Sequence, residues 1–334
     1  MKILTVLTGG TIGSKRENHT LDVKGNVCEI IEIYKEKVEA NTEFQIISPL
    51  NILSENMSVF YFNKLLKFLY EINFNDYDGV IVTHGSDTLS YTAALLGICF
   101  AHINVPMVLV AADYPLSYEK SNGLQNFIGA VELIKSKTVK GVFVSYGTKE
   151  ITDIYFATRL CEADRFLDKF SDFTGTPFAR LKSGNLEFFK SPYNPDLNEI
   201  NKERQPVFEE VPVINESVQI LNCYPSYDYE SIIIKDNIKA FLQLTYHSGT
   251  ISAEDKTVEF LNKCKQKGVD FYLCSLKKSE DLYATTRKIT ELNAYTLYNI
   301  SRESAYAKLL LAYSQNKIKP QDFMEKNIFF ETIL

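Results

Sequence analysis

Two short stretches of the sequence place hydroxyl groups and a carboxylate directly after apolar runs. Residues 7–14 read LTGGTIGS, so Thr11 lies in a glycine-rich turn that follows the run KILTVL. Residues 81–93 read IVTHGSDTLSYTA, where Ser86 and Asp87 follow a second apolar run. A hydroxyl can act as a nucleophile, and a fixed carboxylate can bind a cation. If the two runs are neighbouring parallel strands, these side chains meet in one crevice beyond the strand ends.

The glycine-rich turn has three competing interpretations: a phosphate cradle, a nucleophile turn and a plain structural turn. Glycines let the backbone turn sharply and leave amide N–H groups free for an anion. The spacing of Gly9, Gly10 and Gly13 matches neither a P-loop nor a dinucleotide fingerprint, and the P-loop lysine is missing. Nucleotide binding is therefore disfavoured, whereas the nucleophile turn and the structural turn both stay open.

The second stretch also has a structural interpretation. Ser86 or Asp87 can serve as the N-cap of a helix that runs through Leu96, where it would satisfy free N–H groups of the first turn. His84 invites comparison with a Ser-His-Asp relay, but three members so close together on one turn cannot easily form that relay. We therefore interpret His84 as a structural residue.

Composition and charge narrow the class of ligand. The chain has 334 residues, 45% of them hydrophobic, and a net charge of -6 with no long run of lysine or arginine. This is the composition of an ordinary globular protein long enough for two domains. Binding to nucleic acid or to an anionic membrane requires clustered positive charge, so both are disfavoured. A small zwitterionic or neutral ligand fits better.

The cysteines and the N-terminus indicate a cytoplasmic protein. The six cysteines are scattered without a CxxC pair, and we interpret them as reduced thiols. The run MKILTVL is too short for a signal peptide, and no stretch approaches the length of a membrane span.

Short apolar runs alternate with helix-sized amphipathic segments along the first half of the chain. This pattern predicts an α/β domain with a parallel sheet covered on both faces. The segment 191–212 contains four prolines and little apolar periodicity, so we expect an extended linker there. The same strand pattern resumes afterwards and ends in a helix-like stretch. We therefore predict an N-terminal catalytic domain over 1–190 and a C-terminal α/β domain over 213–334. The predicted strands are KILTVL, EFQIIS, YDGVIVTH, VPMVLVAA and GVFVSY in the first domain and VQILNCY, AFLQLTY and DFYLCSL in the second.

The stretches LTGGTIGS and VTHGSDTLSYTA resemble the two signature motifs, TGGTI and HGTDT, of the bacterial-type asparaginase/glutaminase family. The resemblance extends over the whole chain, including the C-terminal SRESAYAKLLLAY. It implies a doubly wound parallel-sheet N-terminal domain, a smaller α/β C-terminal domain and a homodimer or homotetramer. It also implies hydrolysis of the side-chain amide of L-asparagine, or of glutamine or a related amide, to the acid and ammonia. No cofactor or metal is implied.

The resemblance assigns roles to individual residues. Thr11 matches the threonine that attacks the amide carbon and forms an acyl-enzyme. Asp87 matches the aspartate that holds the substrate's α-ammonium, and Ser54 matches a serine that binds its α-carboxylate. Glu55 occupies the neighbouring substrate-facing position, although SENM at 54–57 can also be a helix N-cap with an acidic first turn.

Three departures from the family pattern affect the expected chemistry. Ser86 stands where the family has threonine, which keeps the hydroxyl and loses the methyl group. Arg159 aligns with a family lysine, and arginine cannot give up its proton to act as a base. Residues 15–33 contain no tyrosine where the family carries an activating one, so His19 or Thr20 would have to substitute.

Two hypotheses follow. The first is an active asparaginase-type amidohydrolase with Thr11, Ser86, Asp87 and Arg159 as candidate catalytic residues. The second is an asparaginase-like protein with little turnover that binds an amino acid in a regulatory or scaffold role.

Overall fold

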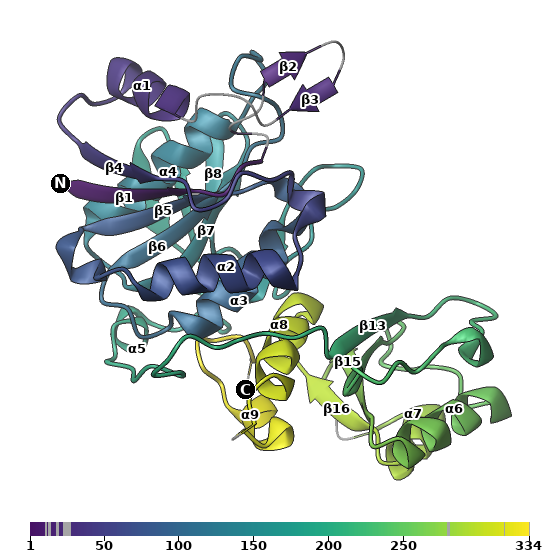
Figure 1. The fold of residues 1–334 in the computed structure, drawn as a ribbon. Helices are drawn as coiled ribbons and strands as arrows, with labels where there is room; N and C mark the ends of the chain where they lie inside the picture. Colours follow the sequence, from purple (N-terminus) through teal and green to yellow (C-terminus); the bar gives the residue numbers. More distant parts are fainter. Residues whose placement is uncertain are drawn as a thin grey trace. The chain divides into compact units, whose positions relative to one another are not determined.

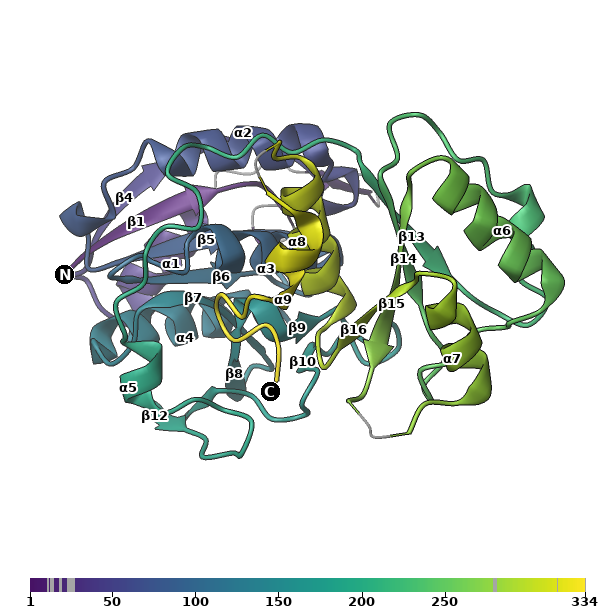
Figure 2. The ribbon, with the colours of Figure 1, turned by 90° about the horizontal axis from the view of Figure 1, so that it is seen from below.

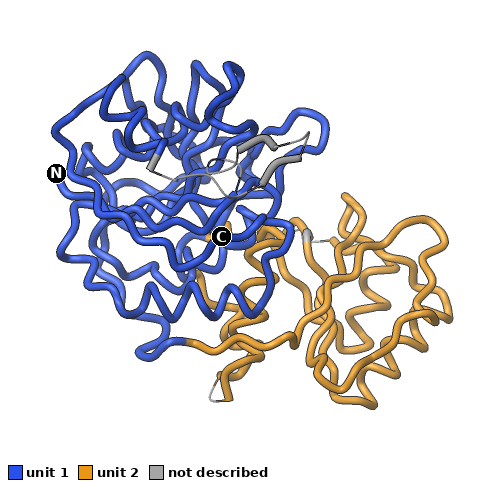
Figure 3. Tube along the Cα trace, turned by 45° about the horizontal axis from the view of Figure 1, so that its top comes forward, with its two compact units in different colours: residues 1–211, 328–330 blue, residues 212–327, 331–334 orange. Residues whose placement is uncertain are grey.

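The chain forms two compact units in the computed structural model (Figures 1 and 3). The structure describes residues 1–10, 12, 15–17, 20–22, 28–278, 281–316 and 318–333, with 15–17, 20–22, 28 and 275 described by their backbone alone. Unit 1 comprises Met1–Val211 and Ile328–Phe330, and unit 2 comprises Pro212–Asn327 and Glu331–Leu334.

A single eight-stranded sheet, ordered β12-β11-β8-β7-β6-β5-β1-β4, forms the centre of unit 1. The strands β4, β1, β5, β6 and β7 are parallel, and β8, β11 and β12 continue the sheet in antiparallel pairs. Their bounds are Lys2–Leu7 (β1), Glu43–Ile47 (β4), Gly79–Thr83 (β5), Pro106–Val110 (β6), Gly141–Gly147 (β7), Ile151–Phe156 (β8), Ala179–Lys182 (β11) and Asn185–Phe188 (β12).

The order of the parallel strands determines where a ligand can bind. Within this parallel set β1 comes first in the chain, yet it lies between the second strand, β4, and the third, β5. The direction in which strands are added reverses at this point, and open α/β sheets bind ligands in the crevice beyond such a switch point. The turns that follow β1 and β5 are therefore the expected walls of a site.

Helices cover both faces of this sheet, as the uninterrupted apolar strands require. Figure 1 shows α1 and α4 on one face and α2 and α3 on the other. Contacts of α4 with β6, β7 and β8 place Phe127 and Ala130 in the main apolar core. The helix bounds are Cys28–Lys37 (α1), Val59–Tyr70 (α2), Leu89–Cys99 (α3), Gly123–Ser136 (α4) and Leu197–Ile200 (α5).

Shorter elements of unit 1 connect these strands and helices. Two antiparallel pairs lie outside the main sheet, namely β2 (Lys15–Glu17) with β3 (Thr20–Asp22) and β9 (Leu160–Cys161) with β10 (Ser171–Asp172). The 3₁₀ turns are η2 (Ser54–Asn56), η3 (Phe74–Asp76), η4 (Ser86–Thr88) and η5 (Ala157–Arg159).

Unit 2 is a smaller α/β layer structure with its own apolar core. Its four strands are parallel in the order β13-β14-β15-β16. Figures 1 and 2 show α6 and α7 on one face of this sheet and α8 on the other. The predicted α/β fold with a parallel-dominated sheet is thus confirmed. The bounds are Val218–Asn222 (β13), Tyr229–Ser231 (η6), Ala240–Leu244 (β14), Asp255–Gln266 (α6), Asp270–Leu276 (β15), Ala284–Glu291 (α7), Tyr295–Tyr298 (β16), Arg302–Tyr313 (α8) and Pro320–Glu325 (α9).

The segment 191–212, expected to be an extended linker, belongs to unit 1 as far as Val211. Ile200 of α5 is fully buried in the core of unit 1, and the Asn201 side-chain amide donates to the Thr138 carbonyl at 2.7 Å. Buried apolar side chains such as Ile200 and Phe208 hold this segment against the domain.

Two further observations concern the cysteines and the helices. The five cysteines whose side chains are described all carry free thiols. Within the described residues, no helix combines the length and the apolar character needed to cross a membrane.

The C-terminal residues Ile328–Phe330 return to unit 1, where hydrogen bonds from η5 hold them. Thr158 Oγ1 donates to the Phe329 carbonyl at 2.6 Å, and Arg159 Nε donates to the Phe330 carbonyl at 2.6 Å. Arg159 Nη1 donates to the Tyr193 carbonyl at 2.8 Å, and its side chain is buried. One guanidinium therefore joins three segments that are far apart in the sequence.

We expect Arg159→Lys to lower the free energy of unfolding by about 1.5–3 kcal/mol, because a lysine cannot reproduce donors at both Nε and Nη1. Urea unfolding monitored by circular dichroism measures this loss. The matched control is Arg287→Lys, at an exposed position, which should leave the unfolding curve unchanged. Equal stability of the two variants would contradict the anchoring role of Arg159.

Candidate functional site

Backbone hydrogen bonds join the loops that follow β1 and β4 to the end of β5. The Thr8 amide donates to the Thr83 carbonyl at 3.3 Å, which continues the pairing of β1 with β5. On the other side, the Ile52 amide donates to the Thr8 carbonyl at 3.0 Å, and the Gly10 amide donates to the Ile52 carbonyl at 3.1 Å. The Gly9–Gly10 turn is thus held between the end of β5 and the loop that follows β4.

The two glycines of this turn are required by its geometry. Gly9 and Gly10 have φ values of +107° and +85°, which side chains rarely tolerate. A Cβ added to Gly10 would lie 2.3 Å from the Gly85 nitrogen, so the two backbones are in direct contact. The prediction of a sharp glycine turn is confirmed. The expected free amide is not found at Gly10, because its N–H already donates to Ile52.

A hydrogen bond between side chains connects the loop that follows β4 with the loop that follows β5. Ser54 Oγ in η2 donates to Asp87 Oδ2 in η4 at 2.9 Å, and Thr88 Oγ1 donates to the Ser54 carbonyl at 2.8 Å. Ser54 is buried, whereas Asp87 is exposed. The loops therefore hold one carboxylate oxygen in a fixed place and leave the group as a whole accessible to solvent.

The helix-capping interpretations of these residues are not observed. Neither η4 nor α3 begins with a side-chain cap hydrogen bond, so Asp87 and Ser86 do not act as N-caps. The same holds for η2, whose N-cap is Leu53, and for α2, whose N-cap is Ser58. The polar side chains of these turns are instead directed toward one another and toward solvent.

His84 is buried and forms hydrogen bonds that hold the loop after β5. Its Nδ1 lies 2.8 Å from the Gly85 carbonyl, which can only accept, so Nδ1 carries the proton. Nε2 is then the acceptor for the Thr92 hydroxyl at 2.9 Å. Complete burial lowers the pKa of His84 to about 4, so the ring is neutral. Both ring nitrogens are thus used by protein atoms, in agreement with the interpretation of His84 as a structural residue.

A cavity of about 450 Å³ opens beside Ser86 and Asp87. Its walls come from the end of β7, the turn after β6 and the loop after β9. Five of the lining side chains are carboxylates and one is a guanidinium, so the cavity favours cationic groups. The lining residues are Ser86, Asp87, Asp113, Tyr114, Tyr146, Glu162, Ala163, Asp164, Arg165 and Asp168.

The remaining candidate residues have different positions. Thr11 and His19 lie outside the described residues, and Thr20 is described by its backbone alone. Glu55 is exposed on η2 next to Ser54. Arg159 was aligned with a lysine beside Ser86 and Asp87. The structure instead directs its Nε and Nη1 to backbone carbonyls of the C-terminal return and of the 191–211 segment.

Three cavity residues that were not predicted from the sequence lie, like Ser86 and Asp87, at the carboxyl end of a parallel strand. Asp113 and Tyr114 follow the strand PMVLV after two alanines, and Tyr146 is the penultimate residue of the strand GVFVSYG. The carboxyl ends of β6 and β7 lie at the same edge of the sheet as that of β5, because the three strands are parallel. Ligands of such sheets bind beyond the carboxyl ends of the strands, so a search for polar residues at the end of every parallel strand would have identified them.

The arrangement combines an accessible carboxylate with a hydrogen-bonded hydroxyl beside a second hydroxyl, that of Ser86. Such a set can bind an ammonium group and hydrogen-bond a carboxylate, which are the two charged groups of an amino acid. No group of three or more histidine, cysteine or acidic side chains suited to a metal ion is found among the residues that the structure describes.

Comparisons with known proteins identify the family and the fold of this chain. Residues 2–211, which correspond closely to the main part of unit 1, match the family described as "Asparaginase, N-terminal". Among curated proteins, a glutamyl-tRNA(Gln) amidotransferase subunit of Pyrococcus abyssi is 25% identical over 353 residues, covering 98% of this chain and 75% of its own length. The corresponding protein of Methanosphaera stadtmanae is 24% identical over 348 residues, with coverages of 98% and 76%.

Solved asparaginase structures share the fold over both units. The thermostable L-asparaginase of Thermococcus kodakarensis superposes with a TM-score of 0.82 at 20% identity, covering 100% of both chains. A probable cytoplasmic L-asparaginase of Campylobacter jejuni superposes with a TM-score of 0.74 at 20% identity, covering 98% of both chains. The family match over residues 2–211, on a chain that has this fold and this cluster of strand-end loops, shows that the protein belongs to the asparaginase family.

Proposed function

We propose that this protein hydrolyses the side-chain amide of L-asparagine to the acid and ammonia, with Thr11 as the nucleophile. The asparaginase fold supports amidohydrolase activity. The observation that carries the proposal is the hydrogen-bonded pair of Ser54 and Asp87, 2.9 Å apart at the switch point of the sheet. The pair lies beside the turn that leads into Thr11.

The Ser54–Asp87 hydrogen bond suggests how an amino acid binds to these two side chains. Without a ligand, the Ser54 hydroxyl donates to Asp87 Oδ2. In the proposed complex, the substrate's α-ammonium takes over as donor to Asp87, and the Ser54 hydroxyl turns to donate to the α-carboxylate. Asp87 thereby exchanges a hydroxyl donor for a cationic one, and hydrogen bonds between charged groups are the stronger kind. Glu55, the neighbouring residue on η2, is proposed to face the substrate.

The chemical step requires one nucleophile and one proton transfer. In the proposed reaction, Thr11 Oγ1 attacks the amide carbon, and its proton passes to the amide nitrogen, which leaves as ammonia. Water then attacks the resulting ester, releasing the acid and returning the proton to Thr11. Ser86 provides a second hydroxyl next to Asp87 for this proton movement. We assign no proton transfer to Arg159, because its Nε and Nη1 donate to backbone carbonyls and a guanidinium does not give up its proton.

Two specific observations favour other candidates. The curated relatives are named as a subunit of a glutamyl-tRNA(Gln) amidotransferase, which favours glutamine as an alternative amide and a role in amide transfer. The structural position of Arg159 favours the second hypothesis, an amino-acid-binding protein with little turnover in a regulatory or scaffold role. Ammonia release from asparagine compared with glutamine separates these candidates. A homodimer or homotetramer in the cytoplasm stays a prediction.

Thr11→Val is expected to abolish ammonia release from asparagine and leave the fold nearly intact. Valine keeps the β-branched shape of threonine and removes only the hydroxyl. Steady-state ammonia release, together with the circular dichroism spectrum of each protein, measures the effect. Full activity of the valine variant would reject Thr11 as the nucleophile.

Asp87→Asn is expected to weaken the binding of L-aspartate by about 10- to 100-fold, corresponding to about 1.5–3 kcal/mol. Asparagine keeps an oxygen that accepts from Ser54 but lacks the charge that pairs with the α-ammonium. Isothermal titration calorimetry measures the affinity, and thermal unfolding serves as the control because stability should change little. A loss of stability as large as the loss of affinity would assign Asp87 a structural role instead.

A further inference from the structure

Tyr146 is a buried phenol at the wall of the cavity that contains Ser86 and Asp87. Its side chain is 4% exposed, whereas Tyr114, the other tyrosine of this cavity, is 42% exposed. A buried hydroxyl normally has at least one hydrogen-bond partner, in the protein or in solvent. The partners of Tyr146 therefore indicate whether the group is structural or serves a ligand.

The position of Tyr146 in β7 directs its side chain away from α4. Its neighbour Ser145 donates to the Asn126 carbonyl of α4 at 2.7 Å, and successive residues of a strand point to opposite faces. The Tyr146 ring packs edge-on against Phe170, with ring centres 4.7 Å apart and planes at 72°. This contact holds the ring without using the hydroxyl.

The hydrogen bonds of the neighbouring Asn122 side chain join it to backbone groups rather than to the Tyr146 hydroxyl. Asn122 Nδ2 donates to the Gly147 carbonyl at 2.7 Å, and Asn122 Oδ1 accepts the Asp113 amide at 3.0 Å. The Asn122 side chain lowers the pKa of Tyr146, against the larger opposite effect of burial. Among the described residues, none is found to accept the Tyr146 proton.

The surroundings keep this phenol protonated. Burial is the main cause that raises the pKa of Tyr146 to about 12, and the charges of Asp113 and Asp168 raise it further. Tyr146 lines the cavity, and a neutral phenol can donate one hydrogen bond into it. An oxygen or nitrogen of a molecule bound in the cavity can accept this hydrogen bond.

We propose that Tyr146 is a substrate-binding residue that donates a hydrogen bond to a carbonyl or carboxylate oxygen of the amino-acid amide held by Asp87. The proposal rests on the proposed function, because it requires an amino acid in this cavity. Asp87 and its neighbouring carboxylates attract the ammonium end of that molecule, and Tyr146 provides the donor that an oxygen end requires. No motif or charge pattern in the sequence distinguished this residue.

The test is Tyr146→Phe in the full chain, which keeps the ring and its contact with Phe170 and removes only the hydroxyl. The affinity for L-aspartate, measured by calorimetry, should fall about 3- to 10-fold, as expected for one hydrogen bond. The kcat/KM for ammonia release from asparagine should fall by a similar factor, and the thermal unfolding temperature should change little.

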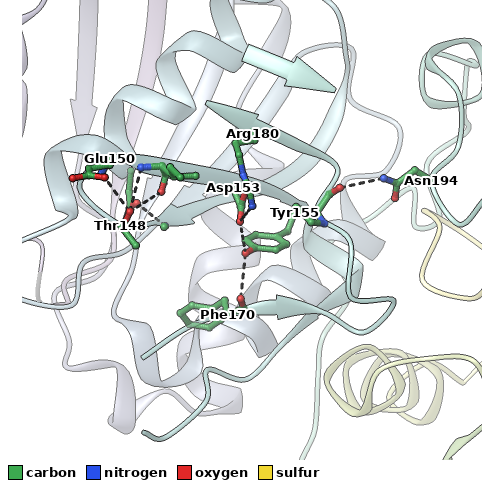
Figure 4. Close-up of polar contacts among 11 residues, drawn as sticks. Thr148, Glu150, Asp153, Tyr155, Phe170, Arg180 and Asn194 are labelled. Atoms are coloured by element: carbon green, nitrogen blue, oxygen red, sulfur yellow. Dashed lines mark hydrogen bonds and ion pairs between the residues drawn. The ribbon is translucent and has the colours of Figure 1, made fainter. Parts of the chain in front are cut away.

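The matched control is Tyr155→Phe on β8, shown in Figure 4. The Tyr155 hydroxyl donates to the Phe170 carbonyl at 3.2 Å and lies 3.4 Å from Asp153 Oδ2, and Asp153 is paired with Arg180 at 2.6 Å. All these partners are protein atoms. Tyr155→Phe should therefore lower the unfolding temperature and leave both the affinity for aspartate and kcat/KM unchanged.

The outcomes separate the two proposals. Unchanged affinity and kcat/KM in Tyr146→Phe would overturn the inference while leaving the proposed function standing. Equal losses in the Tyr146 and Tyr155 variants would also overturn it, because the effect would then be structural. A chain that binds aspartate but releases no ammonia would refute the proposed hydrolysis alone, and the affinity comparison would still decide on Tyr146. A chain that neither binds aspartate nor releases ammonia would refute both proposals.

Discussion

The direct contact between two backbones, at Gly10 and at Gly85, is the constraint on which the candidate site depends. A side chain at Gly10 would meet the Gly85 nitrogen at 2.3 Å, and one at Gly85 would meet Ser54 Oγ at 2.4 Å. Only glycine allows three strand-end loops to converge this closely. The convergence brings Ser54 to Asp87 and places the turn before Thr11 against the same wall. A larger residue at either glycine would separate the loops and break this arrangement.

Burial around this contact determines which groups carry charge. His84 and Tyr146 are both buried, and burial lowers the pKa of the histidine and raises that of the tyrosine, so both are neutral. The charges of the site are then those of Arg165 and of the carboxylates, of which Asp87 is the one fixed by Ser54. A neutral, rigid interior behind a charged, accessible rim suits a small zwitterion, which needs both charge pairing and directional hydrogen bonds.

Arg159, which the resemblance aligns with a lysine, forms a structural link in this protein. An arginine and a lysine at one point of the chain both keep a positive charge, but the guanidinium has several donors in a plane. Here Nε and Nη1 reach two carbonyls from separate segments, at 2.6 Å and 2.8 Å. The residue thereby holds the C-terminal return Ile328–Phe330 in unit 1. These two partners come from segments far along the chain, which no local pattern reveals.

The sequence by itself determined the parallel α/β fold and the position of the turns that follow β1 and β5. Apolar runs of strand length and glycines that demand a positive φ are local properties, so Gly10, Ser86 and Asp87 could be found by reading along the chain. Tertiary structure alone decided which groups meet. The bond from Ser54 to Asp87 spans 33 residues, and Tyr146 reaches the cavity through strand order. Hydrogen bonds and burial require residues to be close in space, and residues far apart in the sequence become close only once the sheet has assembled.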